Sequence, residues 1–427
     1  MNRRGALVLA LVLILGSSCG KQLLPTQPAS DIAARDPVQA LHASRTNDAA
    51  QIIGSTRSGA QFALYRPDHW NRDLVLYAHG YTPPTDPIHL PPIDGLRDQL
   101  LAMGFAVAYS SFSENGLAIK DGIRQTERVE ELFADRLGRP RRTFVIGTSM
   151  GGVIAVALAE DDPEHYRGLL TVSGLIGGSR GLVDYIAHVR VLFDLYYPGV
   201  LQGDLLHIPP GLNLNQHVIG PAVQAMSANP QGAAIISQLV QTPVAFANGP
   251  ELVGSIVQAL ALHFIELDDL LRRTHGDSFF DNSRVTYTGR LPAPVLADIN
   301  ARVARYRSTS DAQELLDDYY EPSGRLRIPM MTIYNERDPV VNPFNETRYR
   351  ERVARRGHAD LLVQRAFPRY GHSEVFSPQE ISQAFAELVA RAGRGDHDDD
   401  DRDSDSRAVA QGAARPDREM AGSHANR

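Results

Sequence analysis

The chain has 427 residues, of which 43% are hydrophobic and 22% are charged, and its formal net charge is -7. This length exceeds what one hydrophobic core holds comfortably, so we expect one large domain with an insertion, or two domains. The composition is that of a globular protein, and its acidic balance has no basic field to attract phosphate groups, which excludes nucleic acid as an expected partner.

The N-terminal segment has the features of an export signal. Two arginines precede an apolar run that ends at Leu15 and is much shorter than the roughly 20 residues of a membrane-spanning helix. We therefore predict a signal peptide over residues 1–19 and an exported protein, periplasmic or extracellular. The end of the segment resembles a bacterial lipoprotein signal, although Gly16 stands where that family usually has a bulky aliphatic residue. The resemblance implies a membrane tether through lipidated Cys19; simple secretion and an uncleaved anchor stay open as alternatives.

Both ends of the chain outside the predicted body are polar. Residues 20–48 are rich in Pro, Ala, Gln and Ser without periodicity, which predicts a flexible linker. Residues 393–427 contain an acidic cluster and few apolar residues, which predicts a disordered acidic tail rather than a calcium site, because no turn glycine or spaced ligand pattern accompanies the cluster. Cys19 is the only cysteine, so no disulfide within the chain is possible.

Between these ends, short β-like runs alternate with amphipathic segments of helix length, a pattern that predicts a mostly parallel sheet with helices on both faces. The predicted strands are Leu74–Ala78, Phe105–Ser110, Thr143–Ile146, Leu169–Ser173, Ile328–Tyr334 and Leu361–Ala366, and the predicted helices between and after them are Gly95–Met103, Asp121–Leu137 and Pro378–Ala392.

One connection is too long for a normal crossover between strands. We assign residues 49–177 and 327–392 to the sheet domain and residues 178–326 to a helical lid or cap inserted into it. The insertion is rich in apolar helical segments, which make a core of their own and would also shape an apolar acyl pocket over the sheet.

The sharpest chemical motif is Gly147-Thr148-Ser149-Met150-Gly151, which follows a predicted strand and precedes a helix-forming run. A serine on such a tight turn has a strained backbone, and the flanking glycines remove side chains that would collide. The turn also places Ser149 at a helix N-terminus, whose free N–H groups favour an oxyanion. Ser149 is therefore the candidate nucleophile.

With this motif the chain resembles the α/β-hydrolase family from about Gln61 to Arg391, apart from the lid. His79-Gly80-Tyr81 follows the strand at Leu74–Ala78, where that family has its His-Gly oxyanion loop. The resemblance implies that the backbone N–H groups of Tyr81 and Met150 form the oxyanion hole, and that His79 is structural.

A serine hydroxyl needs a base with a fixed tautomer. His372 lies in a Gly-His loop after the last predicted strand, and Asp338 follows the strand before it, where the family places its acid; Glu336 is a rival two residues away. The chain order Ser, Asp, His is the one expected for this fold. Glu374 lies close to His372 and could either tune the base or face water, and we expect it to face water.

These residues predict a serine hydrolase that cleaves a carboxylic ester through an acyl-enzyme, with a small-molecule or acyl substrate. No metal pattern or phosphate-binding glycine loop is present, so we expect no cofactor.

Two other functions stay open. A serine peptidase of the prolyl aminopeptidase or tripeptidyl kind has a helical insertion after the same strand and would need lid carboxylates such as Glu266, Asp268 or Asp269 to hold a free amino terminus, but in the sequence these three residues look like the polar face of one helix. An inactive, surface-tethered binding protein is the second alternative, and the presence of serine, aspartate and histidine in order argues against it. Haloalkane or epoxide chemistry is disfavoured because such relatives normally have aspartate in place of Ser149.

Overall fold

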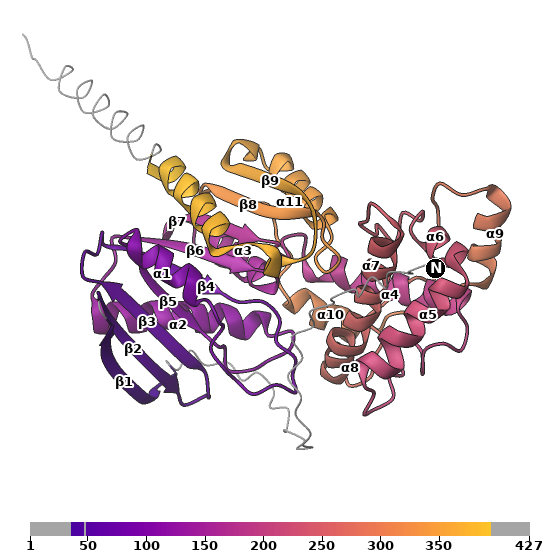
Figure 1. Cartoon of the computed structure of the whole chain (residues 1–427), viewed down its shortest axis with the longest axis horizontal. Helices are drawn as coiled ribbons and strands as arrows, with labels where there is room; N and C mark the ends of the chain where they lie inside the picture. The colour runs from indigo at the N-terminus through magenta and orange to yellow at the C-terminus, as the bar shows by residue number, and fades with distance from the viewer. Residues whose placement is uncertain (1–35, 47, 394–427) are drawn as a thin grey trace, which may run out of the picture.

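The computed structural model describes residues 36–46 and 48–393 (Figure 1). The predicted signal peptide with Cys19, most of the predicted linker and nearly all of the predicted acidic tail lie outside the described residues.

Within the described residues, the sheet has nine strands in the order β1-β2-β3-β5-β4-β6-β7-β8-β9. Their bounds are β1 Val38–Thr46, β2 Ala49–Thr56, β3 Gln61–Pro67, β4 Asp73–Ala78, β5 Ala106–Ser110, β6 Arg142–Thr148, β7 Tyr166–Val172, β8 Met330–Arg337 and β9 Leu362–Tyr370. The pairs from β5 through β4, β6, β7 and β8 to β9 are parallel, whereas β1-β2, β2-β3 and β3-β5 are antiparallel. The sheet is therefore mostly parallel, as predicted.

The central strands are buried on both faces. Every residue of β4 and β5 is buried, which is typical of parallel strands between two helical layers. Val75 and Leu76 are neighbours in β4 and face opposite sides, so each belongs to a different hydrophobic cluster. Because both faces are buried, these strands are continuous apolar runs in the sequence, and they could be predicted from it.

Helices cover both faces of the sheet (Figure 1). Helix α1 (Asp94–Ala102) and the helix over residues 378–393 pack on the face of Val75, and α2 (Ile119–Leu137), α3 (Met150–Asp161) and α11 (Phe344–Arg355) pack on the face of Leu76. The predicted fold class, with a parallel sheet between two helical layers, is confirmed.

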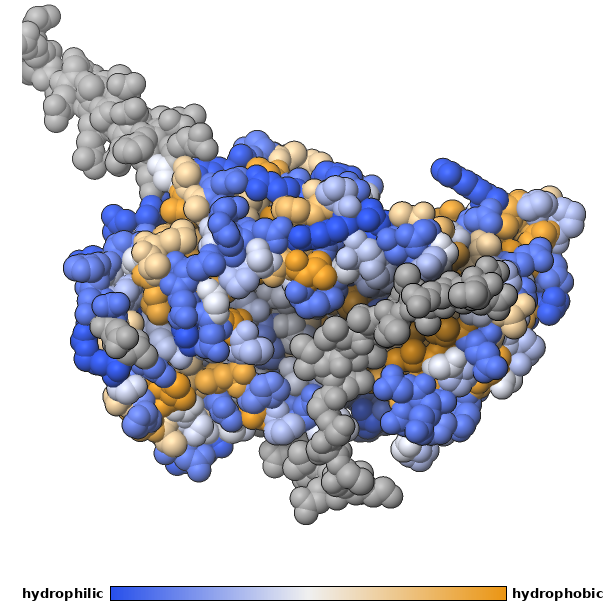
Figure 2. Space-filling view, viewed as in Figure 1, coloured by the Kyte–Doolittle hydropathy of each residue, from blue (hydrophilic) through white to orange (hydrophobic). Residues whose placement is uncertain are grey.

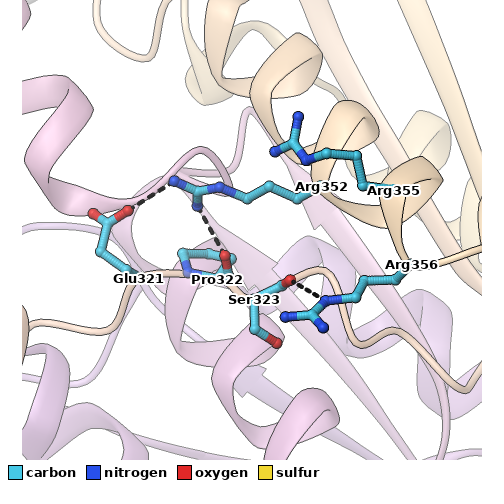
Figure 3. Close-up of a pocket in the computed structure, with 6 residues that line it drawn as sticks. All are labelled: Glu321, Pro322, Ser323, Arg352, Arg355 and Arg356. Carbon is cyan, nitrogen blue, oxygen red and sulfur yellow. Dashed lines mark hydrogen bonds and ion pairs between the residues drawn. The ribbon is translucent and has the colours of Figure 1, made fainter.

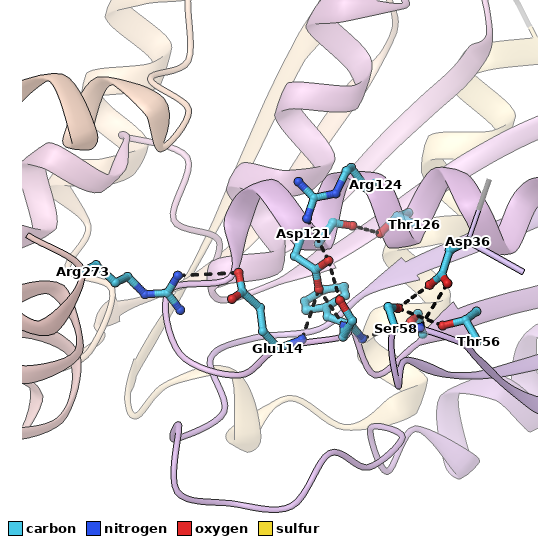
Figure 4. Close-up of polar contacts among 12 residues, drawn as sticks. Asp36, Thr56, Ser58, Glu114, Asp121, Arg124, Thr126 and Arg273 are labelled. Atoms are coloured by element: carbon cyan, nitrogen blue, oxygen red, sulfur yellow. Dashed lines mark hydrogen bonds and ion pairs between the residues drawn. The ribbon is translucent and has the colours of Figure 1, made fainter. Parts of the chain in front are cut away.

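The N-terminal strands correct the predicted linker. Residues 38–46, assigned to the flexible linker over 20–48, form the edge strand β1, which pairs with β2 in a register that sets Leu41 opposite Gly54. Strand β1 is mostly exposed, and Leu41 keeps 40% of its surface accessible, so no alternation of buried and exposed residues marks it in the sequence. Asp36 joins this end to the turn between β2 and β3 by accepting hydrogen bonds from Ser58 (Figure 4).

The connection between β7 and β8 is a helical layer beside the sheet domain (Figure 1). Its elements are α4 Ser179–Tyr196, η1 Asn215–Ile219, α5 Gly220–Ala228, α6 Pro230–Ile236, α7 Gly249–Leu262, η2 His263–Leu267, α8 Asp268–Arg273, α9 Ala293–Arg302 and α10 Ser310–Asp318. Buried side chains of these helices join the hydrophobic cluster on the α2 face of the sheet. The insertion therefore packs onto the sheet domain through a continuous core.

One stretch of the insertion, Gly249–Arg273, is long and apolar enough to cross a membrane, but 67% of its most apolar window is buried inside the protein, as in a core helix. The insertion also exposes large hydrophobic side chains at Val223, Val240 and Phe246. Figure 2 shows hydrophobic residues scattered among hydrophilic ones over both the insertion and the sheet domain.

Candidate active site

Ser149 lies on the turn between β6 and α3 in a backbone conformation that non-glycine residues rarely adopt, with φ 56° and ψ −123°. The turn is tight enough to require its glycines: a Cβ on Gly147 would collide with the carbonyl oxygen of Gly151, and a Cβ on Gly151 with that of Ala78. The strain is held by backbone hydrogen bonds, because the Ser149 N–H donates to the Val172 carbonyl over 3.1 Å and the Leu175 N–H donates to the Ser149 carbonyl over 2.9 Å.

A chain of two hydrogen bonds joins the three predicted catalytic residues. His372 Nε2 lies 2.8 Å from Ser149 Oγ, and His372 Nδ1 lies 2.8 Å from Asp338 Oδ2. Asp338 is fully buried and its second oxygen accepts the backbone N–H groups of Val340 and Val341 over 2.9 and 3.0 Å. With Asp338 ionised, Nδ1 carries the proton, so Nε2 is free to accept the serine proton.

The rival acid lies elsewhere. The side chain of Glu336 is exposed, whereas Asp338 faces the histidine. Another residue of β8, Asn335, was not predicted from the sequence. Its fully buried amide donates hydrogen bonds to the carbonyl oxygens of Gly371 (2.7 Å) and His372 (3.2 Å). Asn335 therefore fixes the loop that carries the base, a role that only the pairing of β8 with β9 reveals.

Charge and burial oppose each other at His372. Burial alone would lower its pKa, but the negative charge of Asp338 and the hydrogen bond to it outweigh burial, with smaller contributions from Glu374 and Glu266, so the pKa of His372 is raised above 6.5. Glu374 is exposed, as predicted, although its carboxylate also accepts the His372 backbone N–H over 3.3 Å.

The loop after β4 packs directly on the nucleophile. A Cβ on Gly80 would lie 3.0 Å from Ser149 Cβ and 3.4 Å from Oγ, so the backbone before Tyr81 borders the serine side chain. Met150 is the first residue of α3, where a backbone N–H has no acceptor within the helix. The two predicted oxyanion residues thus flank Ser149 and line the same cavity.

His79 has no position in this hydrogen-bond chain. It is buried, its ring stacks on Phe112 with 3.8 Å between centroids, and burial lowers its pKa to about 4. Its Nδ1 lies 2.7 Å from the Gly80 carbonyl oxygen.

The insertion closes the site. The cavity beside Ser149 has a volume of only about 10 Å³ in which the centre of a water molecule can lie, so it has room for about one water molecule. It is lined by Tyr81, Leu117, Ser149, Met150, Leu175, Leu182, Glu266, Val340 and Val341. A molecule larger than water therefore enters only if the insertion moves.

Polar contacts dock the insertion around this cavity. The Tyr81 hydroxyl donates to the Ile265 carbonyl over 3.2 Å, and the Leu117 N–H donates to Asp269 over 3.0 Å. Arg273 reaches Glu114 over 3.6 Å, in the loop whose backbone N–H groups are held by Asp121 (Figure 4).

The lid carboxylates differ from the sequence expectation. Glu266 and Asp269 are buried, with 6% and 5% of their surface exposed, so the three acidic residues are not one solvated helix face. The π-helix η2 precedes α8 and interrupts the regular helical periodicity, which the sequence pattern did not indicate.

A larger and more open pocket of about 450 Å³ shares no residue with the cavity at Ser149 (Figure 3). Arg352 in it is paired with Glu321, and Arg355 and Arg356 project from the end of α11. Within residues 36–46 and 48–393, no group of three or more His, Cys, Asp or Glu side chains could hold a metal ion.

Topology brings the three residues to one edge of the sheet. Ser149 follows β6, Asp338 follows β8 and His372 follows β9, all at the carboxyl ends of parallel strands. The nucleophile turn joins a strand to a helix, and the serine, acid and histidine follow in that order. The chain has the α/β-hydrolase fold.

No protein-family model matches the chain, and no curated protein matches its sequence. Solved structures that this chain resembles include an esterase from Aspergillus oryzae, at 14% identity and TM-score 0.48 over 80% of this chain and 81% of that one. Lipase A from Candida antarctica has 12% identity and TM-score 0.41 over 83% of each chain. A monoacylglycerol lipase from Paleococcus ferrophilus has 13% identity and TM-score 0.36 over 78% of this chain and 98% of that one.

Proposed function

We propose that the protein is a serine hydrolase that cleaves a carboxylic ester through an acyl-enzyme on Ser149. The observation that carries the proposal is the hydrogen-bond chain from Ser149 Oγ through His372 to Asp338, with both distances at 2.8 Å. A hydroxyl on a strained turn, a base in reach and an orienting carboxylate together form an activated nucleophile.

In the first half of the reaction, Ser149 Oγ attacks the ester carbonyl while its proton passes to His372 Nε2. The oxyanion lies against the N–H groups of Tyr81 and Met150, where each donor contributes about 3 kcal/mol. The intermediate collapses, the C–O bond to the alcohol breaks, and the alcohol leaves with the proton from His372.

In the second half, His372 takes a proton from water, and the hydroxide attacks the acyl carbon. Collapse returns the proton to Ser149 Oγ and releases the carboxylic acid. Asp338 stays ionised throughout and stabilises the imidazolium that forms in each half. These steps balance without a cofactor.

An apolar acyl group suits the cavity, because most of its wall is hydrocarbon from Leu117, Leu175, Leu182, Val340 and Val341. This supports an acyl group whose frame is mainly hydrocarbon.

The test treats the purified full chain with a fluorophosphonate probe and locates the adduct by peptide mass, with Ser149→Ala as the variant and Ser227→Ala as the control. Ser227 is exposed on α5 and donates only to the Val223 carbonyl. We expect labelling at Ser149 alone in the wild type and the control, and a fall in ester turnover of about 10⁶-fold in Ser149→Ala.

If the folded wild-type protein is not labelled by the probe, the binding-protein alternative is supported instead. Ester turnover retained by Ser149→Ala in a pure preparation would remove the proposal outright.

A further inference from the structure

A buried carboxyl group faces the nucleophile from the insertion. Glu266 lies in η2, keeps 6% of its surface exposed and lines the cavity that Ser149 lines. The rest of the cavity wall comes from aliphatic side chains, Met150 and Tyr81. Glu266 is thus the one acidic side chain among the cavity-lining residues that the structure describes.

Within the described parts of the chain, the Glu266 carboxyl group has no hydrogen bond and no ion pair. Its neighbours along the same helical stretch are all matched: Glu251 pairs with Arg337 over 3.0 Å, Asp268 with Arg272, and Asp269 with Arg273 and the Leu117 N–H over 3.0 Å each. The contact that joins this turn to the sheet domain uses the Ile265 carbonyl, not the Glu266 side chain. Docking of the insertion therefore does not account for Glu266.

An ionised carboxylate without a partner is expensive in such a place. Burial raises the pKa of Glu266 to about 8, opposed by the positive form of His372 and reinforced by Asp269. Below about pH 8 the carboxyl group is therefore mostly protonated, and a cation that entered the cavity would favour its ionised form, with release of the proton.

The surroundings decide what kind of cation fits. A divalent metal takes several oxygen ligands, whereas Glu266 is alone among aliphatic side chains. An anionic group is repelled. An ammonium group on a hydrocarbon frame matches both features, because its charge and N–H donors face the carboxylate and its carbon atoms contact the wall.

We infer that Glu266 binds the protonated amine of the substrate beside the scissile acyl group, so that the enzyme prefers amino-bearing acyl compounds over neutral ones of the same shape. This inference rests on the proposed function and narrows its substrate class.

The experiment compares two esters that differ by one amino group, L-leucine methyl ester and methyl 4-methylpentanoate, by methanol release from the full-length enzyme. The readout is the ratio of kcat/KM for the amino ester to kcat/KM for the neutral ester. We expect the wild type to favour the amino ester, and Glu266→Gln to lower the ratio by about 10- to 100-fold, since a hydrogen-bonded charge is lost.

Asp268→Asn is the matched control, because it removes one carboxylate from the same helical stretch that pairs with Arg272 at the surface, and we expect it to keep the wild-type ratio. Fluorophosphonate labelling of Ser149 in Glu266→Gln shows that the variant is folded around its nucleophile.

Four results separate the two proposals. An unchanged ratio in Glu266→Gln overturns the inference, as does a wild type that does not favour the amino ester. A wild type that is labelled at Ser149 but hydrolyses neither ester overturns the substrate class and leaves the nucleophile standing. A wild type that is not labelled overturns the proposed function itself.

Discussion

The sheet domain holds Asp338 and the insertion holds Glu266; both carboxyl groups are buried and both interact with the charge of His372, yet their surroundings are opposite. Asp338 accepts two backbone N–H groups and the imidazole, so each of its oxygens has a donor. Glu266 faces aliphatic side chains across an enclosed cavity. Protein donors stabilise the charge of Asp338, whereas the charge state of Glu266 depends on which ligand enters the cavity.

The difference separates two uses of a buried acid. A carboxylate with fixed donors is preorganised and keeps one charge state through the reaction. A carboxyl group without donors responds to its environment, because a ligand charge changes its protonation. The sheet domain thus supplies chemistry and the insertion supplies recognition.

The largest expected effect comes from the acid with fixed donors. Asp338→Asn keeps the size of the side chain but removes the charge and presents an amide to His372 Nδ1, which favours the wrong tautomer. We expect kcat/KM for an ester to fall by about 10⁴-fold with the fold intact, measured by steady-state kinetics.

Glu336→Gln is the control for that variant, since Glu336 is exposed two residues away, and it should leave turnover within about twofold of wild type. If the Glu336 variant lost as much activity as Asp338→Asn, the identification of Asp338 as the catalytic acid would be wrong.

The protonation of His372 predicts how activity depends on pH. The base must be neutral to accept a proton, so wild-type kcat/KM should rise with pH through a pKa above 6.5, measured by steady-state kinetics across that range.

The same contrast separates what the sequence could predict from what it could not. Buried strands of a parallel sheet are continuous apolar runs in the sequence, and turn glycines mark where strands end, so the turn of Ser149 was predictable from local pattern. The roles of Asp338 and His372 were predicted from the resemblance to the α/β-hydrolase family. The edge strand β1 was not, because its side chains are mostly exposed. Asn335 carries no pattern of its own, and its role exists only where β8 pairs with β9.

The sequence pointed to Glu266 together with Asp268 and Asp269 but could not distinguish it from them, for a related reason. In the sequence it stands near Asp268 and Asp269, as on the solvated face of a helix. The π-helix before α8 and the packing of the insertion against the sheet decide which of the three faces the cavity. Both are long-range properties that a local pattern does not contain.

Thermal unfolding tests this difference between the two carboxyl groups without any substrate. The pKa of Glu266 is raised to about 8 in the folded protein from 4.5, so the folded state prefers the protonated acid. Stability is therefore lost as pH rises from 4.5, where the unfolded chain begins to ionise, to about 8, where the folded group ionises too. We expect Glu266→Gln to match wild type near the acidic end of this range and to be more stable at its alkaline end, by on the order of 3–5 kcal/mol.

The measurement is the difference in Tm between the two proteins across that pH range, and other titrating groups cancel because both proteins have them. Asp269→Asn is the contrasting variant, since it removes a carboxylate that has donors, and it should be less stable than wild type at all these pH values. A Tm difference for Glu266→Gln that does not depend on pH would mean that the acid has an unrecognised partner in the folded chain.

The smallest effect concerns the contact between the two regions. The Tyr81 hydroxyl donates to the Ile265 carbonyl, next to Glu266, and so joins the oxyanion loop to the insertion. Tyr81→Phe removes about 1 kcal/mol of that contact, and because the cavity is closed, we expect the rate of fluorophosphonate labelling at Ser149 to rise about fivefold. Tyr65→Phe, which loses a contact with Arg97 on the antiparallel side of the sheet, should leave the labelling rate unchanged. A fall in rate for Tyr81→Phe would show instead that the hydroxyl positions the oxyanion loop, and the sheet domain and the insertion would then share the chemistry.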